Sequence, residues 1–221
     1  MVGFESCRKH YKHPEKIMVT GTPVRGDFFA LTKAQAKEKL GVNDGRPLVV
    51  SFWGSLGASG MNRQMADMLA LEAAKEPFHH IHGAGKSGYG MMAALLAEKG
   101  VDLGKHPSLQ LREYIYDMPL WERVADVVIC RAGAMTLSEM ALLRRACILI
   151  PSPNVANNHQ YENAKRLADA GAALMHEEKD LTKDTLEQSV SMLFADESKV
   201  TAMREAIGAF ANPNAKEDIW R

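Results

Sequence analysis

Residues 48–62 read LVVSFWGSLGASGMN, and this stretch sets the fold class of the chain. A short run of β-branched and other apolar residues is typical of a buried strand, and the glycine-rich turn after it leads into a helix. From Pro47 onward, short apolar runs alternate with longer helical stretches. This rhythm predicts an α/β fold, namely a Rossmann-like open parallel sheet with helices on both faces.

Six runs are predicted as strands of this sheet. They are Leu48–Phe52, Phe78–Ile81, Leu109–Ile115, Val127–Cys130, Cys147–Ile150 and Ala172–Met175. The helix after Gly60 carries Met61, Met65 and Met68 at helical spacing, and we predict that this stripe faces the core. Further helices are expected near residues 184–194 and 198–210, and residues 16–20 form a candidate edge strand.

The composition of the chain argues against several classes of function. The 221 residues contain 27 basic and 27 acidic side chains, so no strong field favours a nucleic-acid partner or an acidic membrane. Cys7, Cys130 and Cys147 cannot all pair within one chain, which indicates a reducing compartment. No apolar run approaches the roughly 20 residues that a membrane helix needs. We therefore expect a cytoplasmic protein whose membrane contact, if any, is peripheral.

Two glycine-rich loops follow neighbouring predicted strands. Ligands of open α/β sheets bind beyond the carboxyl ends of the strands, where residues 53–60 and 82–88 are expected to lie. Each loop leads into a helix whose first backbone N–H groups favour an anion such as phosphate. An ordinary tight turn explains the first loop equally well, and in the second loop Lys86 meets either an anion or solvent.

Three histidines invite a metal hypothesis. Strand alternation places His80 and His82 on one face and His79 on the other, which leaves two ligands where a site needs three or more. No acidic or cysteine cluster completes the set. We predict no metal site.

The segment CRAGAMTLSE at residues 130–139 follows the fourth predicted strand. A helix predicted to begin near Thr136 would place Glu139 at the spacing of a capping box. The alternative is that Glu139 accepts hydrogen bonds from a vicinal diol such as ribose. Spacing alone favours the capping role.

The segment PSPNVANNHQYENA at residues 151–164 follows the fifth predicted strand. Its amides and imidazole suit neutral hydroxyls, although Asn157 or Asn158 is expected to cap a helix that starts near Gln160. His159 has no acid or nucleophile beside it in sequence, so a catalytic triad is not supported.

Taken together, the loops resemble glycosyltransferase family 28, specifically the bacterial enzymes that transfer N-acetylglucosamine (GlcNAc) from UDP-GlcNAc onto lipid I. Five motifs carry the resemblance, which extends from about Lys9 to the final helices. TGTPVR at 20–25 is similar to TGNPVR, WGSLGA at 53–58 to GGSxGA, YIYDMP at 114–119 to FIxDM, CRAGAMTLSE to RxGAxTxxE, and NNHQYENA at 157–164 to HQxxNA.

The resemblance implies one half of a two-domain GT-B enzyme. Residues 1–26 would be the linker from a missing N-terminal acceptor domain, and residues 27–221 the C-terminal domain that binds the UDP-sugar donor. The catalytic base would lie in the missing half, so we expect no catalytic residue, cofactor or metal here, and binding without turnover. The intact enzyme would meet lipid I at the cytoplasmic face of the membrane.

The resemblance also assigns binding residues by position. Glu139 would bind the ribose, Ile115 the uracil through its backbone, and Ser55 the diphosphate. Arg25 would lie near the nucleotide end. The sugar would be held by Ala134, Met135, His159 and Gln160, whereas Asn163 is a weaker assignment with a structural alternative.

Three positions depart from the family pattern. Trp53 replaces a glycine of the phosphate loop, Thr22 an asparagine, and residues 144–146 a Gly-x-Pro. Trp53 would either crowd the diphosphate or turn into the core, and we predict that it limits the donor site.

Two rival functions are kept. The first is a stand-alone UDP-sugar-binding subunit that pairs with a membrane partner. The chain starts close to a family motif, and this favours a truncated enzyme over such a subunit. The second is a UDP-sugar epimerase-like protein, which would need acidic catalytic residues where the loops offer only Glu139.

Overall fold

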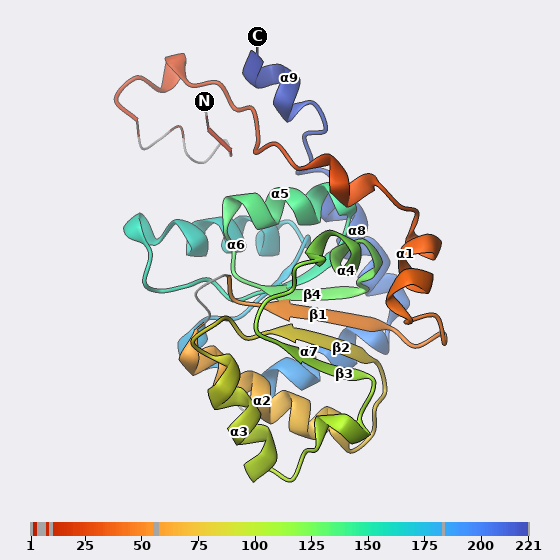
Figure 1. The fold of residues 1–221 in the computed structure, drawn as a ribbon. Coiled ribbons are helices and arrows are strands. Elements are labelled where there is room, and N and C mark those ends of the chain that lie inside the picture. The colour runs from red at the N-terminus through yellow and green to blue at the C-terminus, as the bar shows by residue number, and fades with distance from the viewer. Residues whose placement is uncertain (1, 4–7, 9–10, 55–57, 183, 221) are drawn as a thin grey trace.

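Six parallel strands form a single sheet in the order β3-β2-β1-β4-β5-β6 (Figure 1). The computed structural model describes residues 2–3, 8, 11–54, 58–182 and 184–220. The strands are β1 Leu48–Phe52, β2 His79–Gly83, β3 Leu109–Arg112, β4 Val127–Cys130, β5 Ala146–Leu149 and β6 Leu174–Met175. The predicted Rossmann-like fold class is confirmed.

Helices cover both faces of the sheet, as Figure 1 shows with α2 and α3 on one side and α5 and α6 on the other. The α-helices are α1 Lys33–Leu40, α2 Ser59–Ala73, α3 Tyr89–Glu98, α4 Met118–Val124, α5 Ala134–Leu143, α6 His159–Asp169, α7 Thr185–Phe194, α8 Glu197–Gly208 and α9 Ala215–Trp220. Short 3-10 helices are η2 Pro14–Lys16, η3 Gly26–Phe29, η4 Leu103–Lys105, η5 Ala156–Asn158 and η6 Glu178–Asp180.

The predicted strands agree closely with the observed ones, with two corrections. β3 ends at Arg112, three residues short of the predicted Ile115, because its partner β2 ends at Gly83, which pairs with Arg112. The predicted edge strand at residues 16–20 is not a strand in the described part of the chain, where Val19 forms only an isolated bridge with Val2.

Each face of the sheet packs a separate hydrophobic core. Met61, Met65 and Met68 of α2 are fully buried in the core beneath α2 and α3, which confirms the predicted methionine stripe. The opposite core contains Val50, Cys130 and side chains of α4, α5 and α6. Burial on both faces explains why the strands read as continuous apolar runs and lack polar alternation.

The order of the strands reverses at β1, whose neighbours are β2 on one side and β4 on the other. Connections after β1 and β4 therefore leave in opposite directions, and a crevice opens between them at the carboxyl edge. This switch point is where the fold is built to hold a ligand.

The N-terminal segment lies beside the C-terminal helix, away from the sheet (Figure 1). Asn212 Nδ2 donates to the Thr20 carbonyl at 2.9 Å and joins the two segments. Among the described residues, no helix is both long enough and apolar enough to span a bilayer.

Trp53 belongs to the core and does not face the crevice. Its side chain is 5% exposed and lies in the core cluster beneath α2. The guanidinium of Arg131 lies 5.8 Å from its ring centre, and the same Arg131 donates to the carbonyl oxygens of Ile150 and Pro151. Of the two roles left open by the sequence, crowding of the phosphate loop is therefore wrong, because the indole points into the protein.

Replacing Trp53 by alanine should reduce the free energy of unfolding by about 3–5 kcal/mol, because it removes a large buried aromatic side chain. Trp220 is 83% exposed and provides the matched control, since Trp220→Ala should change stability by less than about 0.5 kcal/mol. Urea unfolding followed by circular dichroism measures both. Equal effects of the two substitutions would show that Trp53 is not a core residue.

Candidate functional site

A cavity of about 440 Å³ opens at the switch point, at the carboxyl edge of the sheet. Backbone from three glycine positions forms one wall, and helices α4 and α5 with the segment before η3 form the other. Its lining is Arg25, Phe28, Phe52, Gly54, Gly83, Gly85, Glu113, Tyr114, Ile115, Met118, Glu122, Met135, Thr136 and Glu139. The cavity combines apolar walls with a few charged groups, which is the usual character of a small-molecule site.

Four of the eight predicted binding residues meet in this cavity: Arg25, Ile115, Met135 and Glu139. They come from segments far apart in sequence, and the fold brings them to one cavity. Ile115 is buried, and a Cβ atom at Gly83 would lie only 3.3 Å from its Cδ1 atom. Glycine at position 83 therefore lets Ile115 pack against the end of β2.

The capping-box prediction for Glu139 is wrong. Helix α5 begins at Ala134 with Gly133 at its N-cap and no side-chain cap, so Thr136 already lies inside the helix. Glu139 is half-buried in the cavity wall, where burial raises its pKa to about 6 despite the opposing attraction of Arg25. The carboxyl group of Glu139 is thus partly desolvated, and it makes no hydrogen bond to the start of helix α5.

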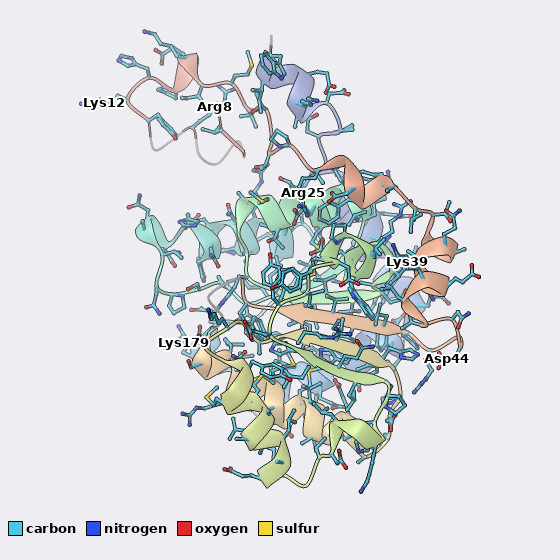
Figure 2. All side chains as sticks on the ribbon, in the orientation of Figure 1. Arg8, Lys12, Arg25, Lys39, Asp44 and Lys179 are labelled. Carbon is cyan, nitrogen blue, oxygen red and sulfur yellow. The ribbon has the colours of Figure 1, made fainter. Side chains whose placement is uncertain are left out.

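Arg25 brings a positive charge to the same cavity. Figure 2 labels it beside helix α5. Its Nη2 atom lies 3.6 Å from Asp27 Oδ2, and its guanidinium lies 5.6 Å from the centre of the Phe28 ring. The side chain is exposed, so its charge remains available to a ligand at the mouth of the cavity.

Of the remaining four predicted residues, Ala134, His159 and Gln160 are not part of this lining. Ser55 lies outside the described residues. Ala134 starts α5 next to the cavity, and its carbonyl accepts from Ser138 Oγ at 3.0 Å. Gln160 Oε1 accepts from the Ser152 backbone at 2.9 Å, and the exposed His159 pairs through Nδ1 with the Ala156 carbonyl at 2.8 Å.

A second cavity, of about 560 Å³, lies at the loop after β5, and its lining includes Asn158 and Tyr161 on either side of His159 and Gln160 in sequence but neither of these two residues. It is lined by Pro151, Ser152, Pro153, Asn158, Tyr161, Glu177, Glu178 and Lys179. Although this cavity is larger, it lies to one side of the switch point, and we favour the first cavity because the predicted nucleotide residues meet there.

The asparagine cap expected before α6 is only partly correct. Asn158 occupies the N-cap position, but its side chain makes no cap hydrogen bond. Asn157 and Asn158 instead adopt left-handed backbone conformations with φ of 53° and 50°, which asparagine tolerates better than most residues. Asn163 has the structural role: its Nδ2 donates to the Ala132 carbonyl at 3.1 Å and ties α6 to the loop that precedes α5.

A buried chain of hydrogen bonds supports the second glycine-rich loop from below. Every side chain in it is essentially inaccessible to solvent. The contacts are Glu72 Oε2 to His80 Nδ1 at 2.8 Å, His80 Nε2 to Ser51 Oγ at 2.7 Å, Ser51 Oγ to His82 Nδ1 at 2.7 Å, His82 Nε2 to Asn62 Oδ1 at 3.2 Å, and Asn62 Nδ2 to the Ala84 carbonyl at 2.9 Å.

The protons in this series of hydrogen bonds can be assigned by starting from the contact with the glycine-rich loop. Because Asn62 donates to Ala84 with Nδ2, its Oδ1 must accept, so His82 Nε2 carries a proton. Burial lowers the pKa of His82 to about 3, so its Nδ1 is unprotonated and accepts from the Ser51 hydroxyl. Ser51 in turn accepts from His80 Nε2.

This arrangement explains the histidine pattern without a metal. His80 and His82 share one face, as predicted, but their ring nitrogens are occupied by Ser51, Glu72 and Asn62. His79 faces the other way and pairs with Asp44 at 2.9 Å. Within the described ranges, no group of three or more His, Cys, Asp or Glu side chains is placed to hold a metal ion.

Sequence reasoning missed two acidic residues of the cavity, Glu113 and Glu122. Glu113 directly follows β3, at the carboxyl edge of the sheet where ligands are expected. Its position in the sequence could therefore have identified it, although it belongs to none of the five motifs. Glu122 lies inside α4, where an acidic residue normally belongs to a solvated face, and only the packing of α4 reveals its position. The expectation that Glu139 is the one carboxylate near the cleft is therefore corrected.

Comparison with known proteins gives a consistent assignment. The family model of the glycosyltransferase family 28 C-terminal domain matches residues 48–219. The chain is 34% identical over 219 residues to the UDP-N-acetylglucosamine–N-acetylmuramyl-(pentapeptide) pyrophosphoryl-undecaprenol N-acetylglucosamine transferase of Acetivibrio thermocellus, an alignment that covers 99% of this chain and 58% of that protein. The chain therefore spans about three fifths of the length of this curated relative.

Solved structures agree on the fold. The structure of MurG from Acinetobacter baumannii aligns with a TM-score of 0.67 and 30% identity, over 80% of this chain and 51% of that one. UDP-GlcNAc 2-epimerase from Neisseria meningitidis, bound to UDP-GlcNAc, aligns with a TM-score of 0.65 over 94% of this chain and 55% of that one. At 13% identity, the second likeness shows the fold alone.

Gly88 should tolerate no side chain, because a Cβ atom there would overlap Asn62 Nδ2 and lie 2.5 Å from the Ala84 carbonyl oxygen. We expect Gly88→Ala to break the Asn62–Ala84 bond and to reduce the free energy of unfolding by about 1–3 kcal/mol. Gly90 within α3 is the matched control, since a Cβ atom added there would meet no neighbouring atom within 4 Å.

Gly90→Ala should therefore be neutral or stabilise the protein by up to about 1 kcal/mol, through helix propensity. Chemical denaturation of both variants distinguishes the two positions. A Gly88→Ala protein as stable as Gly90→Ala would contradict the role assigned to the Asn62 contact.

Proposed function

Because the chain belongs to the family of glycosyltransferase family 28 C-terminal domains, we propose that it binds UDP-GlcNAc as the donor half of a GT-B enzyme that transfers GlcNAc to lipid I. The observation that carries the proposal is the convergence of Arg25, Ile115, Met135 and Glu139 on one cavity at the switch point of the sheet. Residues 1–26 would then be the linker and residues 27–221 the donor domain.

Different regions of the cavity suit the base, the ribose and the diphosphate of a nucleoside diphosphate. Apolar walls that include Phe28, Phe52 and Ile115 accommodate a flat base. Glu139, in its ionised form, accepts two hydrogen bonds from the vicinal hydroxyls of ribose. Gly54 and Gly85 let the backbone approach the diphosphate, near the first turns of α2 and α3, whose N–H groups and dipoles favour negative charge.

The proposed reaction inverts the anomeric carbon of the sugar. An acceptor hydroxyl oxygen forms the new bond to this carbon while the bond to the UDP oxygen breaks, and UDP leaves with both bonding electrons. The acceptor proton passes to a base in the acceptor half of the enzyme. This chain contributes stabilisation of the departing diphosphate by fixed N–H donors, each worth about 3 kcal/mol in comparable sites.

The acceptor and the membrane contact belong to the rest of the enzyme in this proposal. The relative from Acetivibrio thermocellus has about two fifths of its length outside the aligned part. Lipid I would bind there, at the cytoplasmic face of the membrane, and this chain would bind its donor without turnover. The epimerase is the rival that the turnover measurement below separates, whereas a stand-alone UDP-sugar-binding subunit would give the same binding and turnover.

Isothermal titration calorimetry tests the proposal directly. We expect UDP and UDP-GlcNAc to bind in a 1:1 ratio with and without a chelator, because backbone donors and helix termini supply the phosphate contacts. We also expect no GlcNAc transfer to a lipid I analogue and no epimerised sugar from UDP-GlcNAc. Loss of binding on chelation, or formation of either product, would contradict the proposal.

Affinity for UDP-GlcNAc should depend on pH through Glu139. The pKa of about 6 in the free chain means that roughly one tenth of Glu139 is ionised at about pH 5. Ribose hydroxyls favour the carboxylate, so binding lowers this pKa and affinity rises with pH, by up to about tenfold between pH 5 and 7.5. The diphosphate diester of UDP-GlcNAc does not itself titrate in this range.

Glu139→Gln should weaken binding by about tenfold near pH 7.5 and flatten the pH dependence, because an amide offers one acceptor oxygen and no titration. Glu38→Gln, on the exposed side of α1 and outside the cavity lining, should retain both the affinity and the pH profile of the wild type. An unchanged affinity and pH profile in Glu139→Gln would exclude the ribose role.

A further inference from the structure

Glu122 on α4 is a buried carboxyl whose role the preceding sections leave unexplained. Its side chain is 1% exposed, and its Oε2 atom has no hydrogen-bond partner among the described residues. A buried polar atom without a partner costs roughly 1–3 kcal/mol, so such a group calls for an explanation, and a ligand that completes it is one when the residue lines a cavity.

The position of Glu122 identifies where that molecule would bind. Helix α4 packs against η3, α5 and β1, and Glu122 lies on the inner side of α4 as part of the cavity lining. Glu122 therefore borders the cavity at the switch point and carries an unsatisfied buried oxygen.

The surroundings of Glu122 favour the neutral form of its carboxyl. Burial is the main cause that raises its pKa well above the ordinary value, and the nearby negative charge of Glu139 on α5 adds to it. Arg25 opposes these effects only in part, since it also faces Asp27 and Glu139. A neutral carboxyl has one O–H donor and one carbonyl acceptor in the same plane, which a carboxylate lacks.

Two further features indicate the part of the ligand that Glu122 would meet. Phe28, Ile115 and Met118 line the cavity together with Glu122 and give its surroundings an apolar character suited to a flat base. Glu139 is more exposed than Glu122 and suits the ribose. The base of UDP carries two ring carbonyls that accept hydrogen bonds, and the backbone of Ile115 can serve only one of them together with the ring N–H.

We propose that Glu122 is a base-recognition residue, whose carboxyl O–H donates a hydrogen bond to a ring carbonyl of the pyrimidine of the bound nucleotide. The inference rests on the proposed binding of UDP and adds a specificity-determining contact to it. The cost of burying an unpaired carboxyl in the free protein is recovered when the base supplies the missing partner.

Glu122→Leu should have opposite effects on stability and binding, which separates loss of a contact from loss of the fold. Removal of an unpaired buried carboxyl should leave the melting temperature equal to or above that of the wild type. The Kd for UDP should rise about tenfold. Glu122→Gln keeps a donor in its NH₂ group and should bind within about threefold of the wild type.

A second ligand distinguishes the base from the ribose. With 2′-deoxy-UDP, the loss caused by Glu122→Leu should be as large as with UDP, whereas the loss caused by Glu139→Gln should shrink. Arg123→Leu, one position along α4, provides the control: its guanidinium lies over the Phe29 ring at 5.8 Å and is not part of the cavity lining, so both affinities should be unchanged.

The outcomes are decisive in each direction. UDP affinity unchanged in Glu122→Leu, or a loss that disappears with 2′-deoxy-UDP, overturns the inference, while failure of the wild type to bind UDP overturns the proposed function itself. If Glu122→Leu does not fold, difference infrared spectroscopy of the wild type takes its place. The band of a protonated carboxyl should shift on addition of UDP and be missing in Glu122→Gln, and a band that does not respond to UDP overturns the inference.

Discussion

The pairing of β1 with both β2 and β4 is the constraint on which the rest of the structure depends. A strand buried on both faces and hydrogen-bonded on both edges has no freedom of register, because a slip of one residue would move every side chain to the opposite core. The fixed register brings the ends of β1, β2 and β4 to one level. The loops that follow them therefore meet, and the crevice between them is a direct consequence of the strand order.

Polar groups inside this apolar framework are arranged in two different ways. Beneath the sheet, Ser51, His80 and His82 satisfy one another and pass the chain of bonds to Asn62 and the glycine-rich loop. In the cavity, Glu122 and Glu139 share the field of one arginine, and the Oε2 atom of Glu122 has no hydrogen-bond partner among the described residues. The first arrangement supports the loop from below, whereas the second leaves hydrogen-bonding capacity for a ligand.

The sequence was sufficient for the fold class, for most of the strand positions and for four residues that line the cavity, because period and motif spacing report on burial and on the carboxyl edge of a sheet. It failed where neighbours in space decide the outcome. The spacing of Thr136 and Glu139 fitted a capping box, yet the helix starts two residues earlier, after Gly133. Trp53 occupied a phosphate-loop position in the motif, but the orientation of its side chain depends on Arg131 and the core. Glu122 carried no motif at all.

The glycines of the cavity wall have a consequence for how such a domain changes its preference among ligands. Gly54, Gly83 and Gly85 present backbone alone, and Gly54 and Gly85 have positive φ values, so substitution there strains the chain and offers little variety. The opposite wall consists of side chains from α4 and α5, which can vary in size and charge. Only the helical wall of the cavity therefore tolerates varied substitutions. In evolution or engineering of the domain, new ligand selectivity should arise from changes in α4 and α5 while the glycine-rich loops stay the same.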